Sequence, residues 1–388
     1  MSGASAVTEQ RVDGVVVVGL GGIGSAAAHA LAARGETVLG LDPRSAGHRD
    51  GSSHGAARLV RQAYFEDPAY VPLAARAWRL WHDLEAAAGE RLLTPAGVLT
   101  LAAPDDPRGV VPAVLGAAER HGLPVEALAA GEVRRRYPAV RLGDDWQAVL
   151  ERDAGFVDPE ATVRAQLRLA GAAGAELRAD RVVAIEPGDE PVVVTTARRY
   201  RARAVVVAAG PWAPGLLADA GLPIVARRKV VAHFTPRDPA ALGPAALPGF
   251  VLSDAAGLFY GFPFLPGHGV RIGRHDGGED TTPEGVDRVV RPEEVAELRA
   301  ALERVLPEAA GPLLSAVTCL YTMSPDGDFL LGPLPGAPGV VVATGCSGHA
   351  FKFVPALGEA LADLATGRAP GLELGFLDPA RFASAASA

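Results

Sequence analysis

The stretch "GVVVVGLGGIGSAAAHALAARG", residues 14–35, decides the fold that the sequence predicts. It begins with Val15 to Val18, a β-branched run without polar alternation, as expected of a strand buried on both faces. Residues Ser25 to Arg34 are rich in alanine and are followed by Gly35, a pattern typical of a helix and its C-terminal cap. The stretch therefore predicts a buried strand, a glycine-rich turn and a helix.

The turn has the spacing G-x-G-x-x-G, formed by Gly19, Gly21 and Gly24. In a dinucleotide-binding fold the first glycine permits the tight turn, the second lets the backbone approach a pyrophosphate, and the third lets the helix pack closely on the strand. The next strand, "ETVLGLD", ends at Asp42, whose carboxylate can accept hydrogen bonds from both ribose hydroxyls of an adenosine. The same charge would repel the 2′-phosphate of NADP, so NAD and FAD remain as candidates.

Length and composition limit the class of protein. A chain of 388 residues exceeds one typical hydrophobic core, so we expect two domains. A net charge of −8 argues against nucleic acid as a partner, because phosphate neutralisation needs a clustered basic face. No apolar run approaches the ~20 residues that span a bilayer. The N-terminal residues lack the pattern of a signal peptide. We therefore expect a cytoplasmic protein without a membrane partner.

Two residue types are rare enough to be informative. The only cysteines, Cys319 and Cys346, form neither a disulfide framework nor a spaced metal site, so no metal is predicted. Of the 37 basic residues only Lys229 and Lys352 are lysines. A free cysteine is most often a small buried hydrophobe, and composition alone favours that interpretation for Cys319.

The segment "PRSAGHRDGSSHGAARLVRQAY" follows Asp42 and is rich in small and polar residues before it becomes basic and apolar. Its serines and glycines could bring the backbone close to a ring system. Arg58 and Arg61 are three residues apart, which predicts a helix with both side chains on one face. A polar surface loop followed by a solvated basic helix remains the alternative.

Motifs spread along nearly the whole chain resemble those of the monomeric sarcosine oxidase family, within the glycine oxidase and D-amino acid oxidase superfamily. They include "GSSHGAARLVRQAY", "FYGFP", "CLYT" and "GCSGHAFKF", in the same order and spacing. The resemblance implies an α/β fold, with a Rossmann-like FAD-binding domain and a mixed-sheet α+β substrate domain of the D-amino acid oxidase type. We expect a discontinuous FAD-binding domain from residues 1–90, 150–220 and 325–388, and a substrate-binding domain from 91–149 and 221–324.

The resemblance also assigns the cofactor and its contacts. In the family, the cysteine of the "C-x-Y-T" segment is joined to FAD through a thioether, which implies covalent attachment at Cys319. A thiolate is a strong nucleophile, and neighbouring cations such as Arg58 would favour the reaction. Together, the glycine motif and the resemblance predict these FAD-binding residues: Gly19, Gly21, Gly22, Ile23, Gly24, Asp42, Ser53, His54, Arg58, Val182, Gly210, Trp212, Cys319, Gly348, His349 and Lys352.

Substrate binding is expected to depend on two cations from separate parts of the chain, because two charges fix the position and orientation of a carboxylate. The resemblance assigns this role to Arg61 and Lys352. It further implies that Tyr260 and Tyr321 border the substrate and that His275 orients it or modulates its protonation.

Two departures from the family pattern concern mechanism and substrate size. Arg271 stands where the family has a lysine that promotes the reaction of reduced flavin with oxygen; arginine keeps the charge but not the shape. Val251 stands in place of a bulky thioether, which predicts a pocket for an N-substituent larger than methyl.

The sequence thus predicts an FAD-dependent oxidase of secondary or N-substituted amino acids. We expect hydride transfer to flavin N5, imine hydrolysis and reoxidation by O2 to H2O2, in a monomer or homo-oligomer. N-alkylglycines and N-carboxymethyl amino acids are the favoured substrates. A flavin dehydrogenase with another electron acceptor, a cyclic imino acid substrate and, more remotely, an NAD-dependent dehydrogenase remain alternatives.

Overall fold

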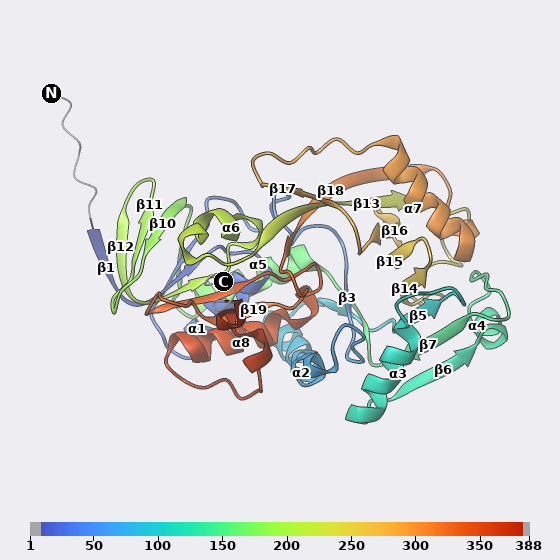
Figure 1. Cartoon of the computed structure of the whole chain (residues 1–388), viewed down its shortest axis with the longest axis horizontal. Helices are drawn as coiled ribbons and strands as arrows, with labels where there is room; N and C mark the ends of the chain where they lie inside the picture. The colour runs from blue at the N-terminus through green and yellow to red at the C-terminus, as the bar shows by residue number, and fades with distance from the viewer. Residues whose placement is uncertain (1–8, 383–388) are drawn as a thin grey trace.

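The computed structural model describes residues 9–382, which build two large β-sheets that lie side by side and a small third sheet (Figure 1). The first large sheet contains β1 (Glu9–Val18), β2 (Val38–Leu41), β9 (Glu176–Arg178), β10 (Val182–Glu186), β11 (Val192–Thr195), β12 (Arg199–Val207), β19 (Leu330–Pro333) and β20 (Val340–Thr344). At its centre β1 pairs in parallel with both β2 and β12, and β12 pairs in parallel with β20. This is the parallel sheet that the glycine-rich stretch predicts.

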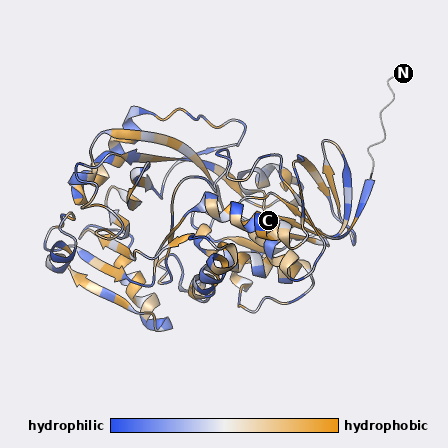
Figure 2. Cartoon of the chain, turned by 180° about the vertical axis from the view of Figure 1, so that it is seen from behind, coloured by the Kyte–Doolittle hydropathy of each residue, from blue (hydrophilic) through white to orange (hydrophobic). Residues whose placement is uncertain are grey.

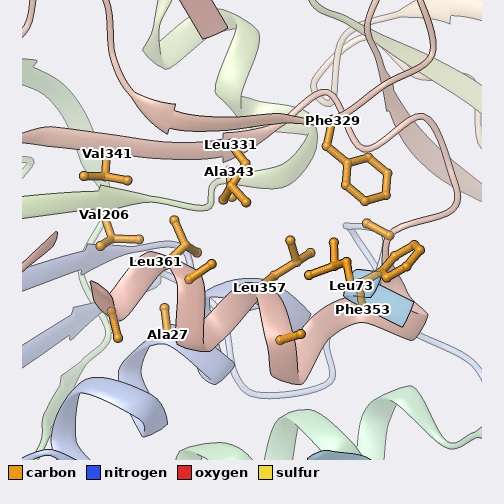
Figure 3. Close-up of a cluster of buried hydrophobic side chains, with 14 of the residues drawn as sticks. Ala27, Leu73, Val206, Phe329, Leu331, Val341, Ala343, Phe353, Leu357 and Leu361 are labelled. Carbon is orange, nitrogen blue, oxygen red and sulfur yellow. The ribbon is translucent and has the colours of Figure 1, made fainter. Parts of the chain in front are cut away.

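Four helices belong to this part of the chain: α1 (Gly22–Ala33), α2 (Val71–Ala88), α5 (Pro159–Ala172) and α8 (Val354–Ala365). The helix predicted after the glycine turn is α1, and it begins three residues earlier than Ser25. Figure 3 shows α8 beneath the sheet, with Leu357 and Leu361 directed toward Val206, Leu331 and Ala343. This buried cluster fixes where the carboxyl ends of the strands lie relative to α1.

The second large sheet is mixed and carries most of the remaining strands: β5 (Val98–Ala102), β6 (Val125–Ala129), β7 (Gln147–Glu151), β13 (Val225–Phe234), β14 (Gly249–Asp254), β15 (Gly257–Leu265), β16 (Gly269–Arg274), β17 (Glu279–Thr281) and β18 (Leu313–Met323). All its pairings are antiparallel except that of β5 with β14. Three helices accompany it: α3 (Val110–His121), α4 (Ala130–Arg136) and α7 (Pro292–Val305). Figure 2 shows many hydrophobic residues along the strands, whereas the outer helices carry a mixture.

The small sheet joins β3 (Arg58–Val60), β4 (Leu93–Thr94) and β8 (Gly155–Val157). The predicted helix containing Arg58 and Arg61 is therefore wrong: Arg58–Val60 pairs in antiparallel fashion with Gly155–Val157, and Arg61 follows the strand. Backbone pairing with a strand distant in sequence outweighs the local three-residue spacing, which by itself is compatible with either structure.

The two large sheets are built from different parts of the chain. We therefore propose the same two domains that the sequence predicts, each containing one of these sheets. The boundary at residue 149 falls inside β7, which runs on to Glu151. The remaining helix, α6 (Ala213–Leu216), follows a short 3-10 turn at Gly210–Trp212. Within residues 9–382 no helix is both long and apolar enough to cross a membrane.

Candidate active site

The glycine turn after β1 has the geometry that the motif predicts. Gly19 has a positive φ of 86°, and a Cβ there would lie 2.6 Å from the carbonyl oxygen of Ala208. A Cβ on Gly24 would lie 1.8 Å from the carbonyl oxygen of Gly19. Neither position can hold a side chain. Because both are glycine, the turn can bring the N-terminus of α1 close to the ends of β1 and β12.

Asp42 lies at the end of β2, next to this turn. Its Oδ2 accepts a hydrogen bond of 2.9 Å from the Leu20 amide, and its Oδ1 accepts one of 2.9 Å from the Arg44 amide. A carboxylate has about four lone-pair positions, so these two bonds fix its orientation and leave acceptor capacity for a ligand hydroxyl.

A cavity of about 660 Å³ extends from this turn to the second sheet. Nineteen of the twenty-two predicted site residues line it, from parts of the chain around both large sheets: Gly19, Gly21, Gly22, Ile23, Asp42, Ser53, Arg58, Arg61, Val182, Gly210, Trp212, Val251, Tyr260, His275, Cys319, Tyr321, Gly348, His349 and Lys352. Gly24, His54 and Arg271 do not line it. The structure thus gathers most of the predicted set around one space.

Cys319 lies on β18 and is buried in the cavity wall. Burial raises the pKa of its thiol, and the cations Arg58, Arg271 and Lys229 oppose that rise. Arg58 is held in place by two hydrogen bonds of 2.8 Å from its Nη2 to the carbonyl oxygens of Ser52 and His54. The thiol therefore lies in an apolar wall with positive charge around it, and this charge reduces but does not cancel the effect of burial on its pKa.

His54 and Arg271 lie behind this wall. His54 is buried, and within the described part of the chain its Nε2 has no hydrogen-bond partner. Burial together with Arg58 lowers its pKa to about 3. Arg271 is buried on β16 and donates a 2.8 Å hydrogen bond from Nη1 to the Ala57 carbonyl oxygen, while none of the described residues accepts a hydrogen bond from its Nε. The predicted functional cation at position 271 is thus bonded to a backbone carbonyl oxygen and does not line the cavity.

Arg61 is buried just after β3 and is already paired within the chain. Its Nη2 donates to both carboxylate oxygens of Glu66, at 2.7 and 2.6 Å, and its Nη1 donates to the Ala63 carbonyl oxygen at 3.0 Å. Burial alone would raise the pKa of Glu66, but Arg61 and the more distant His349 and Lys352 lower it to about 2. Glu66 therefore remains ionised, and the pair presents a cation and an anion side by side in the cavity wall.

Lys352 belongs to the 3-10 turn Phe351–Phe353 that precedes α8. Its Nζ donates to the carbonyl oxygen of His349 at 2.7 Å and to the hydroxyl of Tyr64 at 3.2 Å. Burial, followed by the nearby Arg61 guanidinium, lowers the pKa of Lys352 to about 7. Arg61 and Lys352 both line the cavity, and Cζ of Arg61 and Nζ of Lys352 lie 4.3 and 4.9 Å from the centre of the same Tyr64 ring, so the two predicted carboxylate-binding cations are neighbours in one wall.

His275 follows β16 directly, and its ring lies 5.8 Å from that of Tyr321 and 6.3 Å from that of His349, measured between centroids. Burial lowers the pKa of His275 to about 4, so the imidazole is neutral near pH 7. Gly348 has a positive φ of 84°, and a Cβ there would lie 2.0 Å from the Tyr321 ring. The backbone of this loop thus passes directly against Tyr321.

Lys229 lies on β13 opposite Cys319 of β18 and holds the chain just after β16. Its Nζ donates to three carbonyl oxygens, those of His275 at 2.8 Å, Asp276 at 2.6 Å and Gly277 at 3.0 Å. All three ammonium protons are therefore used, and the backbone that carries His275 is fixed.

Comparison with known proteins agrees with this geometry. The model of the FAD dependent oxidoreductase family matches residues 14–364. The protein belongs to this family. It is 42% identical to a monomeric sarcosine oxidase of Streptomyces avermitilis, over 96% of this chain and 98% of that protein. It is 34% identical to an N-methyl-L-tryptophan oxidase of Citrobacter koseri, over 93% and 96%. An L-proline dehydrogenase from P. horikoshii superposes with a TM-score of 0.84 at 25% identity, covering 97% of this chain and 99% of that one.

These matches decide between the dinucleotides. The FAD-dependent oxidoreductase is an enzyme acting on CH–NH donors, with the D-amino acid oxidase type of fold, and the NAD-dependent alternative is wrong. The residues present also fit FAD. Besides the glycine cradle and Asp42, Thr344 at the end of β20 lines the cavity with a buried hydroxyl that has no hydrogen-bond partner among residues 9–382, as expected of a group that meets a bound ligand.

Sequence reasoning missed several residues of this site: Tyr64, Glu66, Glu151, Lys229 and Thr344. Glu151 is buried and accepts hydrogen bonds from the amides of Gln62 and Ala63 at 2.5 and 3.2 Å, and burial raises its pKa to about 7. Lys229 could have been found from the scarcity of lysine. Tyr64 and Glu151 act through contacts with distant segments, of which the local sequence carries no sign, whereas Glu66 pairs with Arg61 only five residues away.

Proposed function

We propose that this FAD-dependent oxidoreductase oxidises the C–N bond of an N-substituted amino acid larger than sarcosine. The observation that carries the proposal is the pair Arg61 and Lys352, two buried cations in one wall of the cavity that also contains the glycine cradle. Two cations at one place suit a carboxylate, and their separate origins would fix its orientation. The relatives' names, a sarcosine oxidase and an N-methyl-L-tryptophan oxidase, support an N-substituted amino acid as the substrate class.

The other residues would orient the amine. His275 is neutral because of burial, so it can exchange a hydrogen bond with the substrate nitrogen without forcing it to stay protonated. Tyr260 and Tyr321 line the same cavity and would confine the substrate between them. Bound FAD would accept a hydride at N5, and the imine product would hydrolyse in water. An N-substituted glycine oxidised at its glycyl carbon would give glyoxylate and a primary amine.

Val251 supports a substituent larger than methyl. It is buried on β14 and lines the cavity, and its side chain is shorter than the thioether that the family carries there. Candidates are N-alkylglycines and N-carboxymethyl amino acids, with cyclic imino acids such as proline or pipecolate as the alternative. Anaerobic bleaching of the flavin against a panel of these compounds tests the proposal. Bleaching by none of them would reject it.

We also propose that FAD is attached through Cys319. The thiol lies in the cavity wall among Arg58, Arg271 and Lys229, which oppose the effect of burial on its pKa. Positive charge there would favour both the thiolate and negative charge on the flavin ring. The attachment is an addition to the FAD assignment and does not affect it.

A second candidate function differs from the first in its electron acceptor. We propose O2, reduced to H2O2, as for an oxidase. A flavin dehydrogenase with another acceptor is favoured by Arg271, whose guanidinium is bonded to Ala57 and does not line the cavity, so that it is poorly placed to stabilise charge on oxygen. Stopped-flow reoxidation of the reduced enzyme in air-saturated buffer, with peroxide measured, separates the two. Rapid reoxidation with stoichiometric peroxide would exclude the dehydrogenase.

A further inference from the structure

Tyr64 and His349 make a chain of hydrogen bonds behind Lys352. Tyr64 Oη lies 2.5 Å from Nδ1 of His349 and accepts a 3.2 Å hydrogen bond from Lys352 Nζ. On its other side, Nε2 of His349 lies 2.9 Å from the carbonyl oxygen of Gly327. Tyr64 and His349 are both buried.

The donor and the acceptor of each of these hydrogen bonds follow from the bond between His349 and the Gly327 carbonyl oxygen. A carbonyl oxygen can only accept, so Nε2 of His349 carries the proton. Burial lowers the pKa of His349 to about 3, so the ring holds a single proton near pH 7 and Nδ1 is an acceptor. The hydroxyl of Tyr64 must then donate to Nδ1. Its lone pairs are left facing Lys352, to which Tyr64 can only be an acceptor.

Two of the hydrogen-bonding positions of Lys352 Nζ are already used within the protein. One N–H goes to Tyr64 and a second to the carbonyl oxygen of His349, so the remaining direction is open to the cavity that Lys352 lines. A charged ammonium presents a third N–H there, whereas a neutral amine presents a lone pair. Only the charged form can bind a carboxylate.

We propose that Tyr64 and His349 are positioning residues for Lys352: the imidazole sets the direction of the Tyr64 hydroxyl, and the hydroxyl oxygen holds the ammonium charged and aimed at the substrate carboxylate. This inference rests on the proposed role of Lys352 in binding that carboxylate. It adds two residues that act on the substrate through Lys352: Tyr64, which does not line the cavity, and His349, which lines it and also orients Tyr64.

Other charged groups face Lys352 from the elements around it. Arg61 lowers its pKa, while Glu66 beside Arg61 and Glu151 at the end of β7 raise it. Glu151 has its own pKa raised to about 7, so a pH profile of activity would combine two groups. His275, whose ring lies 6.3 Å from that of His349 between centroids, is neutral near pH 7. A test must therefore observe Lys352 itself.

The chain permits such a test because it contains only two lysines. Holoenzyme labelled with ¹³C at lysine Cε, with a tag that lacks lysine, gives two side-chain signals, and Lys352→Met assigns them. The titration of Lys352 is then compared in wild type, Tyr64→Phe and the matched control Tyr70→Phe. Tyr70 is as buried as Tyr64 and also uses its hydroxyl, which accepts a 3.0 Å hydrogen bond from the Phe329 amide, but it does not contact Lys352 Nζ.

We expect the pKa of Lys352 to fall by about one unit in Tyr64→Phe, as for loss of an acceptor from a charged donor, and to stay unchanged in Tyr70→Phe. The binding of methoxyacetate, a carboxylate without an amine, should weaken by about tenfold at pH 8.5 but only about twofold at pH 6, where about half of the variant lysine is still charged. Purely structural damage would weaken binding equally at both values.

An unchanged pKa of Lys352 in Tyr64→Phe would overturn the proposed positioning role of Tyr64 and His349. If that variant does not fold, His349→Gln should shift the pKa in the same direction by removing the group that orients the hydroxyl, and no shift there has the same meaning. If Lys352 does not bind the substrate carboxylate at all, Lys352→Met should leave the binding of methoxyacetate unchanged. This result distinguishes failure of the proposed carboxylate site from failure of the positioning role of Tyr64.

Discussion

Removing the charge of Glu66, which is paired with buried Arg61, is predicted to lower the stability of the protein and to strengthen the binding of a carboxylate. Glu66→Gln keeps the volume of the side chain and removes its charge. The ordinary pKa of 4.5 falls to about 2 in the folded protein, and a difference of this size corresponds to ~3 kcal/mol of stability at neutral pH. The side chains are only 5% and 20% exposed, so solvent screens the pair little.

The pH dependence follows from the sign of that shift. Because the pKa is lower in the folded state, the stabilisation is complete above pH ~4.5 and is lost as the pH falls through about 2. We therefore expect Glu66→Gln to lower the free energy of unfolding by ~3 kcal/mol at pH 7, with the difference from wild type shrinking below pH ~4.5. Urea unfolding followed by tryptophan fluorescence at both ends of this range measures it.

Binding should change in the other direction. In the wild type, Nη2 of Arg61 is occupied by Glu66, whose charge also repels an incoming carboxylate. The amide of the variant keeps one acceptor oxygen but loses the negative charge and the second acceptor, so methoxyacetate should bind severalfold more tightly, as followed by the flavin spectrum. The control is Glu132→Gln, which removes a carboxylate paired with Arg135 and Arg136 on the surface and should change neither quantity much.

This combination of results distinguishes the pair from general damage. A variant that simply packs worse would lose both stability and affinity. The reasoning is refuted if Glu66→Gln is as stable as the Glu132 control at pH 7, or if it binds methoxyacetate more weakly than wild type.

Four other changes test single positions. Cys319→Ser should release all flavin into the supernatant on acid denaturation, whereas wild type keeps its colour; colour lost equally from both would disprove the tether. Gly24→Ala places a Cβ 1.8 Å from a carbonyl oxygen and should prevent FAD binding, measured by flavin content after purification. Val251→Met should raise kcat/KM for sarcosine relative to larger N-alkylglycines by about tenfold, and an unchanged ratio would remove Val251 from the specificity pocket. Lys229→Arg should disturb His275 and lower turnover at least tenfold, because a planar guanidinium cannot donate to the three carbonyl oxygens as an ammonium does; wild-type kinetics would contradict this.

The parts of the fold that the sequence predicts are those in which the physical constraint is local. A valine run buried on both faces, a turn that excludes Cβ atoms and an acid after the next strand each follow from a few adjacent residues. The predicted helix at Arg58 and Arg61 was wrong for the converse reason. Whether that segment is a strand depends on its pairing with residues 155–157, almost 100 positions away.

The same distinction separates the site residues that sequence reasoning finds from those that it misses. Arg61 and Lys352 lie in motifs, and both are in the cavity wall. The partners that set their charge and direction, Glu66 and Tyr64, occur at unremarkable positions and gain their roles only from the folded structure. Arg271 shows the reverse: its place in the sequence suggests a contact with the cavity, yet its guanidinium is turned to the Ala57 carbonyl oxygen.

The two lysines connect these observations. In a chain that otherwise uses arginine for its basic residues, both lysines are buried near the active site, and each donates hydrogen bonds to backbone carbonyl oxygens. An ammonium directs its protons tetrahedrally from one atom, which suits three converging carbonyl oxygens at Lys229 and an open third direction at Lys352. Arginine has a planar fork that spreads its donors apart, and its pKa is too high to change charge near pH 7. The geometry of the two environments is thus a sufficient physical reason for lysine at these positions, whatever general preference the rest of the chain follows.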